Sequence, residues 1–218
     1  MNFLSLFLCA IVGYLIGSIP NALIIGKYFY KKDIREFGSH NLGGTNAGRV
    51  LGPKAGVSVI VLDILKMAIS IVIAFFMCKA FKIEDATLYL GVASIMSAIG
   101  HCYPIYCGFK GGKAVSVVAG FLLITNPILL LIWGAIFFLT LKIKKMVSLG
   151  SMLASILTSI LMFIPIWDKI MLPYISYNIY YPITFTLLTL LLIYRHIPNI
   201  KRIMNHTESK IKWMDHKK

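Results

Sequence analysis

The chain has 218 residues, of which 58% are hydrophobic and 14% carry a charge, and its mean hydropathy is +0.81. These values exclude an ordinary soluble domain and indicate an integral membrane protein. The formal net charge of +14 would suggest nucleic-acid binding in a soluble protein, but here the cations lie between apolar runs, where they meet phospholipid headgroups or anionic substrates instead.

Seven apolar runs follow one another along the chain, and a membrane span needs about 20 residues. The runs cover residues 3–26, 55–77, 86–106, 114–125, 128–141, 147–165 and 179–195. The fourth and fifth are short and meet at Asn126-Pro127, so they are either full spans that share a tight outer turn or a re-entrant pair. No internal repeat or soluble domain is visible. We therefore expect an all-α, seven-helix membrane bundle that forms one domain over residues 1–218.

The positions of Lys and Arg predict the orientation of the bundle, because short cytoplasmic loops carry the excess of positive charge. With the N-terminus outside, eighteen of the 22 Lys and Arg residues lie on the cytoplasmic side, and only Lys79, Lys82 and Lys169 lie outside. The first run lacks a basic leader and a small-residue cleavage site, so it is expected to remain as the first span. The C-terminus is then cytoplasmic.

Several common catalytic patterns are missing from the sequence. Residue 113 is Lys where a Walker A loop needs its second Gly, and neither G-x-S-x-G nor H-E-x-x-H occurs. No His is followed by Asp at the fifth position, which excludes the H-x-x-x-x-D acyltransferases. The four cysteines show no C-x-x-C spacing, so they are expected to be buried apolar thiols. No metal or other cofactor is expected.

The first of three polar segments covers residues 37–49 and follows the first apolar run. Its polar residues are Ser39, Asn41, Thr45, Asn46 and Arg49, and its closely spaced glycines are Gly43, Gly44 and Gly48. The glycines let a ligand approach the backbone, the neutral side chains offer hydrogen bonds, and the Arg offers a planar, bidentate cation. The alternative is an ordinary flexible loop, but the density of donors exceeds what a turn requires.

The second polar segment, residues 108–113, follows the third apolar run. Gly111 and Gly112 expose backbone N–H groups, and Lys113 is predicted to open the next helix, whose N-terminus attracts anions. The alternative for Lys110 and Lys113 is a cationic anchor at the membrane surface.

The third polar segment begins at the end of the last apolar run. Pro198 disfavours helix at Ile197 and suits the start of a new helix, so His196 is predicted to end the last span and Asn199 to lie in the first turn beyond it. The alternative for His196 is a purely structural hydrogen bond. Arg195 is expected to contact lipid headgroups.

Two charges lie within the second apolar run. Asp63 and Lys66 are three residues apart and share one face of a helix. Charges inside a membrane are usually paired or functional, so an ion pair is expected, with direct substrate contact as the alternative. His101, at the cytoplasmic end of the third run, is expected to make a structural hydrogen bond.

The three polar segments, in this order, resemble the three motifs of the bacterial acyl-phosphate-dependent glycerol-3-phosphate acyltransferases. The resemblance covers essentially the whole chain and extends to Gly17-Ser18-Ile19-Pro20, to Asp63 with Lys66, and to Ser148 and Ser151. The sequence departs from the family pattern at a few positions. His40, Ala114 and Asn205 stand where Gly is usual, and Gly44 stands where Ala is usual.

The resemblance implies an enzyme of the bacterial inner membrane that transfers a fatty acyl group from acyl phosphate to the 1-hydroxyl of glycerol 3-phosphate. The products are lysophosphatidic acid and phosphate, formed at the cytoplasmic face in the first step of phospholipid synthesis. Besides these substrates, only membrane lipids are expected as partners. The enzyme is expected to work as a monomer.

The resemblance also implies roles for individual residues. His196 and Asn199 would orient glycerol 3-phosphate, and Ser39, Arg49, Lys113 and Ser148 would bind phosphate, with Ser151 as an alternative to Ser148. The remaining expected substrate-binding residues are Asn41, Gly43, Thr45, Asn46, Gly111, Gly112 and Arg202. Backbone N–H groups near Gly43 and Gly111 would stabilise the oxyanion.

Two other functions are compatible with parts of the sequence. A secondary transporter of a small organic phosphate would suit the charges at Asp63 and Lys66. Against it, the spans show no inverted repeat, and every polar segment lies on one side of the membrane. A noncatalytic lipid-binding protein would leave the clustered Ser, Asn and Arg residues unexplained.

Overall fold

The computed structural model describes residues 2–169 and 177–211, and within these ranges all regular secondary structure is helical. The α-helices are α1 (Phe3–Gly17), α2 (Asn21–Tyr30), α3 (Gly44–Leu51), α4 (Pro53–Ala80), α5 (Thr87–Cys102), α6 (Val115–Thr125), α7 (Pro127–Lys144), α8 (Val147–Leu161), α9 (Tyr180–Arg195) and α10 (Ile197–Met204). Short 3-10 helices cover Ile34–Glu36, Ile105–Cys107 and Pro165–Lys169.

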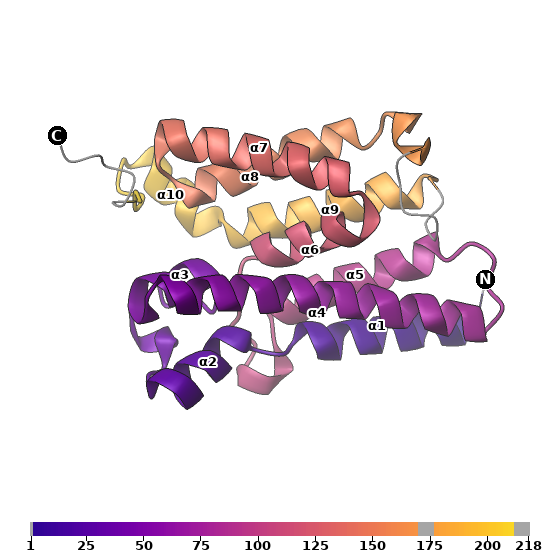
Figure 1. Cartoon of the computed structure of the whole chain (residues 1–218), viewed down its shortest axis with the longest axis horizontal. Helices are drawn as coiled ribbons and strands as arrows, with labels where there is room; N and C mark the ends of the chain where they lie inside the picture. Colours follow the sequence, from indigo (N-terminus) through magenta and orange to yellow (C-terminus); the bar gives the residue numbers. More distant parts are fainter. Residues whose placement is uncertain (1, 170–176, 212–218) are drawn as a thin grey trace.

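The longer helices lie side by side along one axis of the molecule (Figure 1). The short helices α2, α3 and α10 gather at the end opposite the start of α1 (Figure 1). These short helices carry or flank the first and third polar segments. The polar segments at residues 37–49 and 196–202 therefore lie at the same end of the bundle.

Each predicted apolar run contains a helix, but not every helix has spanning length. Among the described residues, four stretches are long and apolar enough to cross a membrane: Phe3–Tyr30, Pro53–Ala80, Thr87–Cys107 and Pro127–Lys144. The bent pair of α9 and α10, with 56° between its members, makes a fifth if counted as one span. Helices α6 and α8 are apolar but shorter. The fold is thus an all-helical membrane bundle with four or five helices of spanning length.

The first apolar run, predicted as one span over residues 3–26, lies within one candidate span, Phe3–Tyr30, but the helix in this span is broken. Helix α1 ends at Gly17 and α2 begins at Asn21. Pro20 has no N–H group and its ring clashes with a helical carbonyl, so the helix cannot pass through it. At the break the Ile19 carbonyl has no helical partner four residues on. It accepts instead from the Asn21 N–H (3.1 Å) and from the Lys66 side chain of α4 (3.0 Å).

Small residues bring α1 against α5. A side chain at Gly13 would overlap the Ala93 carbonyl, and one at Gly17 would overlap the Ser97 carbonyl. The sequence shows these glycines but not the helix that they contact. This packing places the break after α1 beside the C-terminal end of α5, from which the second polar segment continues.

The fourth and fifth predicted runs form two separate helices. The side chain of Asn126 accepts a hydrogen bond from the Leu129 N–H (3.0 Å), and Pro127 is the first residue of α7. An Asn cap followed by Pro is a favourable helix start. The cap accepts a hydrogen bond from a free N–H of the first turn, and Pro has no N–H that would need a partner. The predicted division at Asn126-Pro127 is confirmed.

Candidate active site

The three polar segments, far apart in the sequence, contact one another. The Asn41 side-chain amide donates to the Gly111 carbonyl (3.3 Å), which joins the first segment to the second. The Lys113 ammonium donates to Asn199 Oδ1 (2.6 Å), which joins the second to the third. The structure therefore brings the three polar segments together.

Asn46 holds the first segment together from inside. Its Oδ1 accepts from the Ser39 N–H (2.8 Å), and its Nδ2 donates to the carbonyls of Ile34 (3.0 Å) and Phe37 (3.2 Å). Because the amide is buried and both of its ends are used, Asn46 shapes the loop, and the structure gives its side chain no free group for a ligand. The sequence shows the amide but not its three long-range partners.

Two of the closely spaced glycines, Gly44 and Gly48, lie against helix α4. A side chain at Gly44 would overlap Ile60 of α4, and Gly48 lies against Gly56 of the same helix. The space beside Gly44 is filled by α4, so a ligand cannot approach the backbone there, whereas a side chain at Gly48 would make only an ordinary contact with Gly56 (3.6 Å). Only Asn41 Oδ1 comes near a side chain placed at Gly43, so this position is more open.

The backbone of this loop takes a conformation that is unusual for a residue with a side chain. His40, at the position where the family usually has Gly, has φ +56. Such left-handed angles are unfavourable for most side chains, and here the His40 ring forms a hydrogen bond to the Arg35 carbonyl (2.8 Å), with Nδ1 as donor. That bond stabilises the turn.

Ser39, Thr45 and Arg49 are exposed at the surface of the first segment. None of the side-chain hydrogen bonds or ion pairs among the described residues occupies the two hydroxyls or the guanidinium. These three side chains are therefore available to an external ligand.

The second segment is fixed by contacts on both sides. The Gly112 N–H donates to the His101 carbonyl (2.9 Å), and Arg195 donates to the carbonyls of Gly112 (3.1 Å) and Gly111 (3.4 Å). Arg195, expected at the lipid headgroups, instead packs over the Tyr103 ring at 4.9 Å and holds this loop. The sequence offers one signal for this role: Arg195 stands directly before His196 of the third segment.

Lys113 precedes α6 and does not open it. The helix begins at Val115, and Ala114 before it has φ +65, a left-handed angle that separates Lys113 from the helix. Burial and, to a lesser extent, nearby cations, chiefly Arg202, together lower the pKa of Lys113 to about 8, while Glu208 opposes the shift. Arg195 and Arg49 act in the same direction as Arg202. A half-buried Lys among three arginines is a strong attractor for an anion.

The third segment has the predicted architecture. Helix α9 ends at Arg195, His196 stands between the helices, and the Asn199 N–H donates to the His196 carbonyl (2.8 Å) in the first turn of α10. The His196 ring is buried, and its Nδ1 donates to the Leu192 carbonyl (2.8 Å), since a carbonyl only accepts. In the neutral ring, Nε2 is then the free acceptor.

Glu208, for which the sequence suggests only a backbone or basic partner, lies at the centre of the site. Its Oε1 accepts from Ser148 Oγ (2.7 Å) and Asn199 Nδ2 (2.7 Å), and its Oε2 accepts from Arg202 Nε (2.8 Å). Burial acts to raise the pKa of Glu208, but these three hydrogen bonds outweigh it and hold the pKa below its usual value. The only signal in the sequence is an acidic residue in a strongly basic tail.

The contacts of Glu208 settle which serine faces the site. Ser148 Oγ reaches Glu208, whereas Ser151 Oγ donates to the Ser148 carbonyl (3.0 Å) and is fully buried. Ser148 lies in the first turn of α8, where the helix dipole also favours the carboxylate. Among the described residues, no group of three or more His, Cys, Asp or Glu side chains could hold a metal ion.

Comparison with known proteins identifies the family. A family model described as glycerol-3-phosphate acyltransferase matches residues 7–206. The chain belongs to the glycerol-3-phosphate acyltransferase family. The prediction of an acyltransferase is thereby confirmed, and the alternative of a transporter finds no support.

Bacterial members of the acyltransferase family match along nearly their whole length. The glycerol-3-phosphate acyltransferase of Listeria welshimeri is 44% identical over 211 residues, which cover 97% of this chain and 99% of the relative. The Bacillus subtilis protein of the same name is 44% identical over 207 residues, which cover 95% of this chain and 98% of the relative.

Solved structures of an acyltransferase have the same fold. The crystal structure of PlsY (YgiH), an integral membrane glycerol 3-phosphate acyltransferase, in its glycerol 3-phosphate form superposes with a TM-score of 0.82 at 31% identity, covering 97% of this chain and 98% of PlsY. The lysophosphatidic acid form gives a TM-score of 0.79, again at 31% identity, with 95% of each chain covered. The acyltransferase described above is thus an integral membrane protein of this fold.

Proposed function

We propose that this acyltransferase takes its acyl group from acyl phosphate and transfers it to the 1-hydroxyl of glycerol 3-phosphate. The hydroxyl oxygen bonds to the acyl carbon, the bond from that carbon to the phosphate oxygen breaks, and the hydroxyl proton passes to a phosphate oxygen. The products are lysophosphatidic acid and inorganic phosphate. The observation that carries the proposal is the Lys113–Asn199 contact (2.6 Å), because it places a cation from the second segment against the third.

The arrangement of charges supports two phosphates side by side. Arg49 offers an unoccupied guanidinium on one side, and Lys113 and Arg202 lie within electrostatic range of each other. Phosphate is already a good leaving group, so the protein needs to position the hydroxyl and stabilise developing charge. This agrees with a sequence that has no Ser-His-Asp set.

The proposed roles follow the geometry of each residue. Ser39, Arg49, Lys113 and Ser148 bind phosphate, and His196 and Asn199 orient glycerol 3-phosphate. Thr45, Gly43 and the Gly111-Gly112 backbone line the same region, while Asn41 and Arg202 hold neighbouring parts of it through Gly111 and Glu208. The Gly112 N–H is used by the His101 carbonyl, so it is not the oxyanion donor.

Purified protein with palmitoyl phosphate and labelled glycerol 3-phosphate tests the proposal. We expect one inorganic phosphate for each lysophosphatidic acid formed, and little transfer from palmitoyl-CoA, because the described residues include no soluble domain for its large nucleotide. Faster turnover with the thioester under matched conditions would show that acyl phosphate is not the donor. Uptake of glycerol 3-phosphate into proteoliposomes without acyl transfer would instead support a transporter.

We further propose that the chain forms one domain with seven membrane segments, the N-terminus outside and the active site at the cytoplasmic face of the bacterial inner membrane. In this arrangement it works as a monomer. The charge asymmetry of the loops supports this topology, as does the position of α3 and α10 at the end opposite the start of α1 (Figure 1). Lys212, Lys217 and Lys218, which contribute to the asymmetry, lie outside the described residues.

The topology predicts which positions an impermeant reagent can reach. In a cysteine-free background, single cysteines at Thr45 and His206 should resist labelling from outside in intact cells and react after the membrane is opened. A cysteine at Glu84, exposed in the loop between α4 and α5, should react from outside. Labelling of position 45 or 206 in intact cells would contradict the proposed orientation.

Arg49→Lys tests whether the planar fork of the guanidinium is needed. The variant keeps the charge but loses bidentate geometry, so kcat/KM should fall by about 2–3 kcal/mol of transition-state stabilisation. Arg35→Lys is the matched control, because the Arg35 guanidinium is already occupied by a bidentate pair with Asp33 (2.9 and 2.6 Å). Equal turnover of Arg49→Lys and the wild type would remove Arg49 from phosphate binding.

A further inference from the structure

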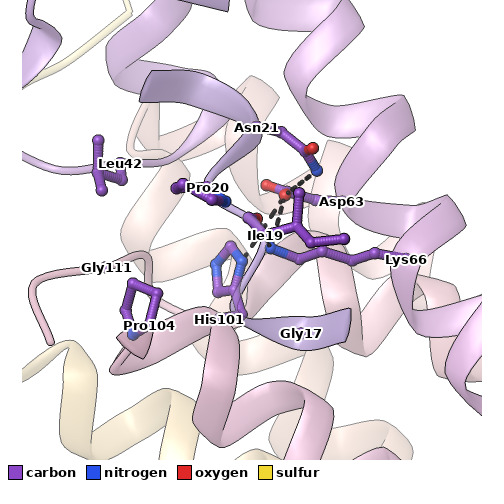
Figure 2. A pocket seen from close by; sticks show the side chains of 10 residues that line it. All are labelled: Gly17, Ile19, Pro20, Asn21, Leu42, Asp63, Lys66, His101, Pro104 and Gly111. Carbon is purple, nitrogen blue, oxygen red and sulfur yellow. Dashed lines mark hydrogen bonds and ion pairs between the residues drawn. The ribbon is translucent and has the colours of Figure 1, made fainter. Parts of the chain in front are cut away.

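A buried group of charges lies directly beneath the second polar segment and has no part in the proposed chemistry. Asp63 and Lys66 of α4 are 1% and 5% exposed, and His101 at the end of α5 is 5% exposed. Figure 2 shows the His101 ring between this ion pair and the loop that carries Gly111. Burying charges is unfavourable unless they are paired. The partners of these three side chains therefore show which parts of the chain the group connects.

The first connection runs from the ion pair to the break in the first span. Lys66 Nζ lies 3.0 Å from Asp63 Oδ1 and donates to the Ile19 carbonyl (3.0 Å) between α1 and α2. Asn21 Nδ2 donates to the same carboxylate oxygen (3.0 Å). The predicted ion pair is confirmed, and it also binds the carbonyl that the helix break leaves without a helical partner.

The second connection runs from the ion pair to the loop. His101 Nδ1 lies 3.8 Å from Asp63 Oδ1, which is too long for a hydrogen bond but leaves the buried ring next to the carboxylate. The His101 carbonyl accepts from the Gly112 N–H (2.9 Å). A side chain at Gly112 would overlap the His101 ring, and one at Gly111 would overlap the His101 carbonyl. The loop therefore rests on His101 with no space between them.

The space around the network is too small for a substrate. The cavity lined by Asp63, Lys66, His101 and Gly111 has a volume of about 10 Å³, which is the size of a single water molecule. The alternative of direct substrate contact by Asp63 and Lys66 is thereby disfavoured. Charges enclosed in this way interact strongly, because little solvent screens them.

We propose that Asp63, Lys66 and His101 are positioning residues for acyl transfer. They hold the Gly111-Gly112 loop, and Lys113 at its end, in the geometry that binds the substrate phosphate, and they fix this loop to the break after α1. The inference rests on the proposed function only in that the loop is taken to bind a substrate. A simple ion pair would stabilise the fold without controlling the loop.

Charge-balanced variants separate these two roles. Asp63→Asn and Lys66→Met each leave one buried charge unpaired and should lower Tm. The double variant removes both charges, so its Tm should return toward the wild-type value. Because the links to Ile19 and His101 are still missing, its kcat/KM should remain at least tenfold reduced. An ion pair that serves only stability would let kcat/KM recover together with Tm.

Hydrogen exchange gives a second readout that does not depend on activity. The amides of residues 108–114 should exchange at least tenfold faster in the double variant and in His101→Ala, while residues 87–93 at the other end of α5 stay unchanged. Trp133→Phe is the control, because it removes a buried hydrogen bond to Ser155 (3.1 Å) between α7 and α8. It should alter neither the loop exchange nor kcat/KM.

Two outcomes would overturn the proposal. One is a double variant that recovers both Tm and kcat/KM, and the other is unchanged loop exchange in His101→Ala with unchanged activity. If the double variant fails to regain its Tm, His101→Ala decides, since it leaves the ion pair in place. Absence of acyl transfer in the wild type would refute the proposed donor but leave the exchange result intact, so the two failures are distinguishable.

Discussion

Lys113→Ala should lower kcat/KM by about 2–4 kcal/mol of transition-state stabilisation, on the order of 30- to 900-fold. Lys113 donates to Asn199, and its neighbours Arg195 and Arg202 are held by Gly112 and Glu208, so neither of them can move its charge into the vacated position. Steady-state kinetics on purified, monodisperse protein measures the effect. Lys110→Ala is the same-loop control, because Lys110 is exposed, and it should change kcat/KM far less.

The pH dependence identifies Lys113 as the source of the effect. Since the pKa of Lys113 is lowered to about 8, the side chain is charged below that pH and loses its charge as the pH rises through it. Wild-type kcat/KM should therefore fall above about pH 8. In Lys113→Ala this part of the decline should disappear. In Lys113→Arg the charge persists at alkaline pH, so the decline should disappear there as well. The same alkaline decline in Lys113→Ala as in the wild type would assign it to another group.

Glu208→Gln should have the second large effect, a loss of about 2–3 kcal/mol in kcat/KM. The Glu208 carboxylate only accepts hydrogen bonds, and the Lys113 ammonium only donates them, so together they fix which end of the Asn199 amide faces each. Glutamine has nearly the same shape but turns one acceptor into a donor. Asn199, Ser148 or Arg202 then loses its partner, and Asn199 is no longer held in one orientation.

The test of Glu208 needs a structural control, because its side chain is only 6% exposed. Tm and elution volume report whether Glu208→Gln is folded, and Glu84→Gln, an exposed acid in the loop between α4 and α5, should behave like the wild type. Glu208→Asp keeps the charge with a shorter reach and should retain more activity than Glu208→Gln. If Gln retains as much activity as Asp, the acceptor-only character of the carboxylate is not what matters.

Much of the fold follows from local sequence. Apolar runs require helices in a membrane, because backbone groups can be satisfied within a helix and lipid offers no partners. The division at Asn126-Pro127 depends on the Asn cap and the Pro, and the turn from His196 to Asn199 depends on Pro198. The break after α1 also comes from one proline, Pro20. The hydropathy of the apolar run does not change at this proline, so the sequence predicts one uninterrupted run.

The sequence by itself determined that this chain is a helical membrane protein, that Asp63 pairs with Lys66 three residues on, and that three polar segments form its candidate site. Each of these depends on spacing within a helix or a short motif. Only the tertiary structure decided that Arg195 holds the Gly111-Gly112 loop, 83 residues away, and that Glu208 meets Ser148 across 60 residues. It also decided that Asn46 faces inward. Such contacts depend on how helices pack, and hydrogen-bond partners chosen by packing leave no periodic pattern in the sequence.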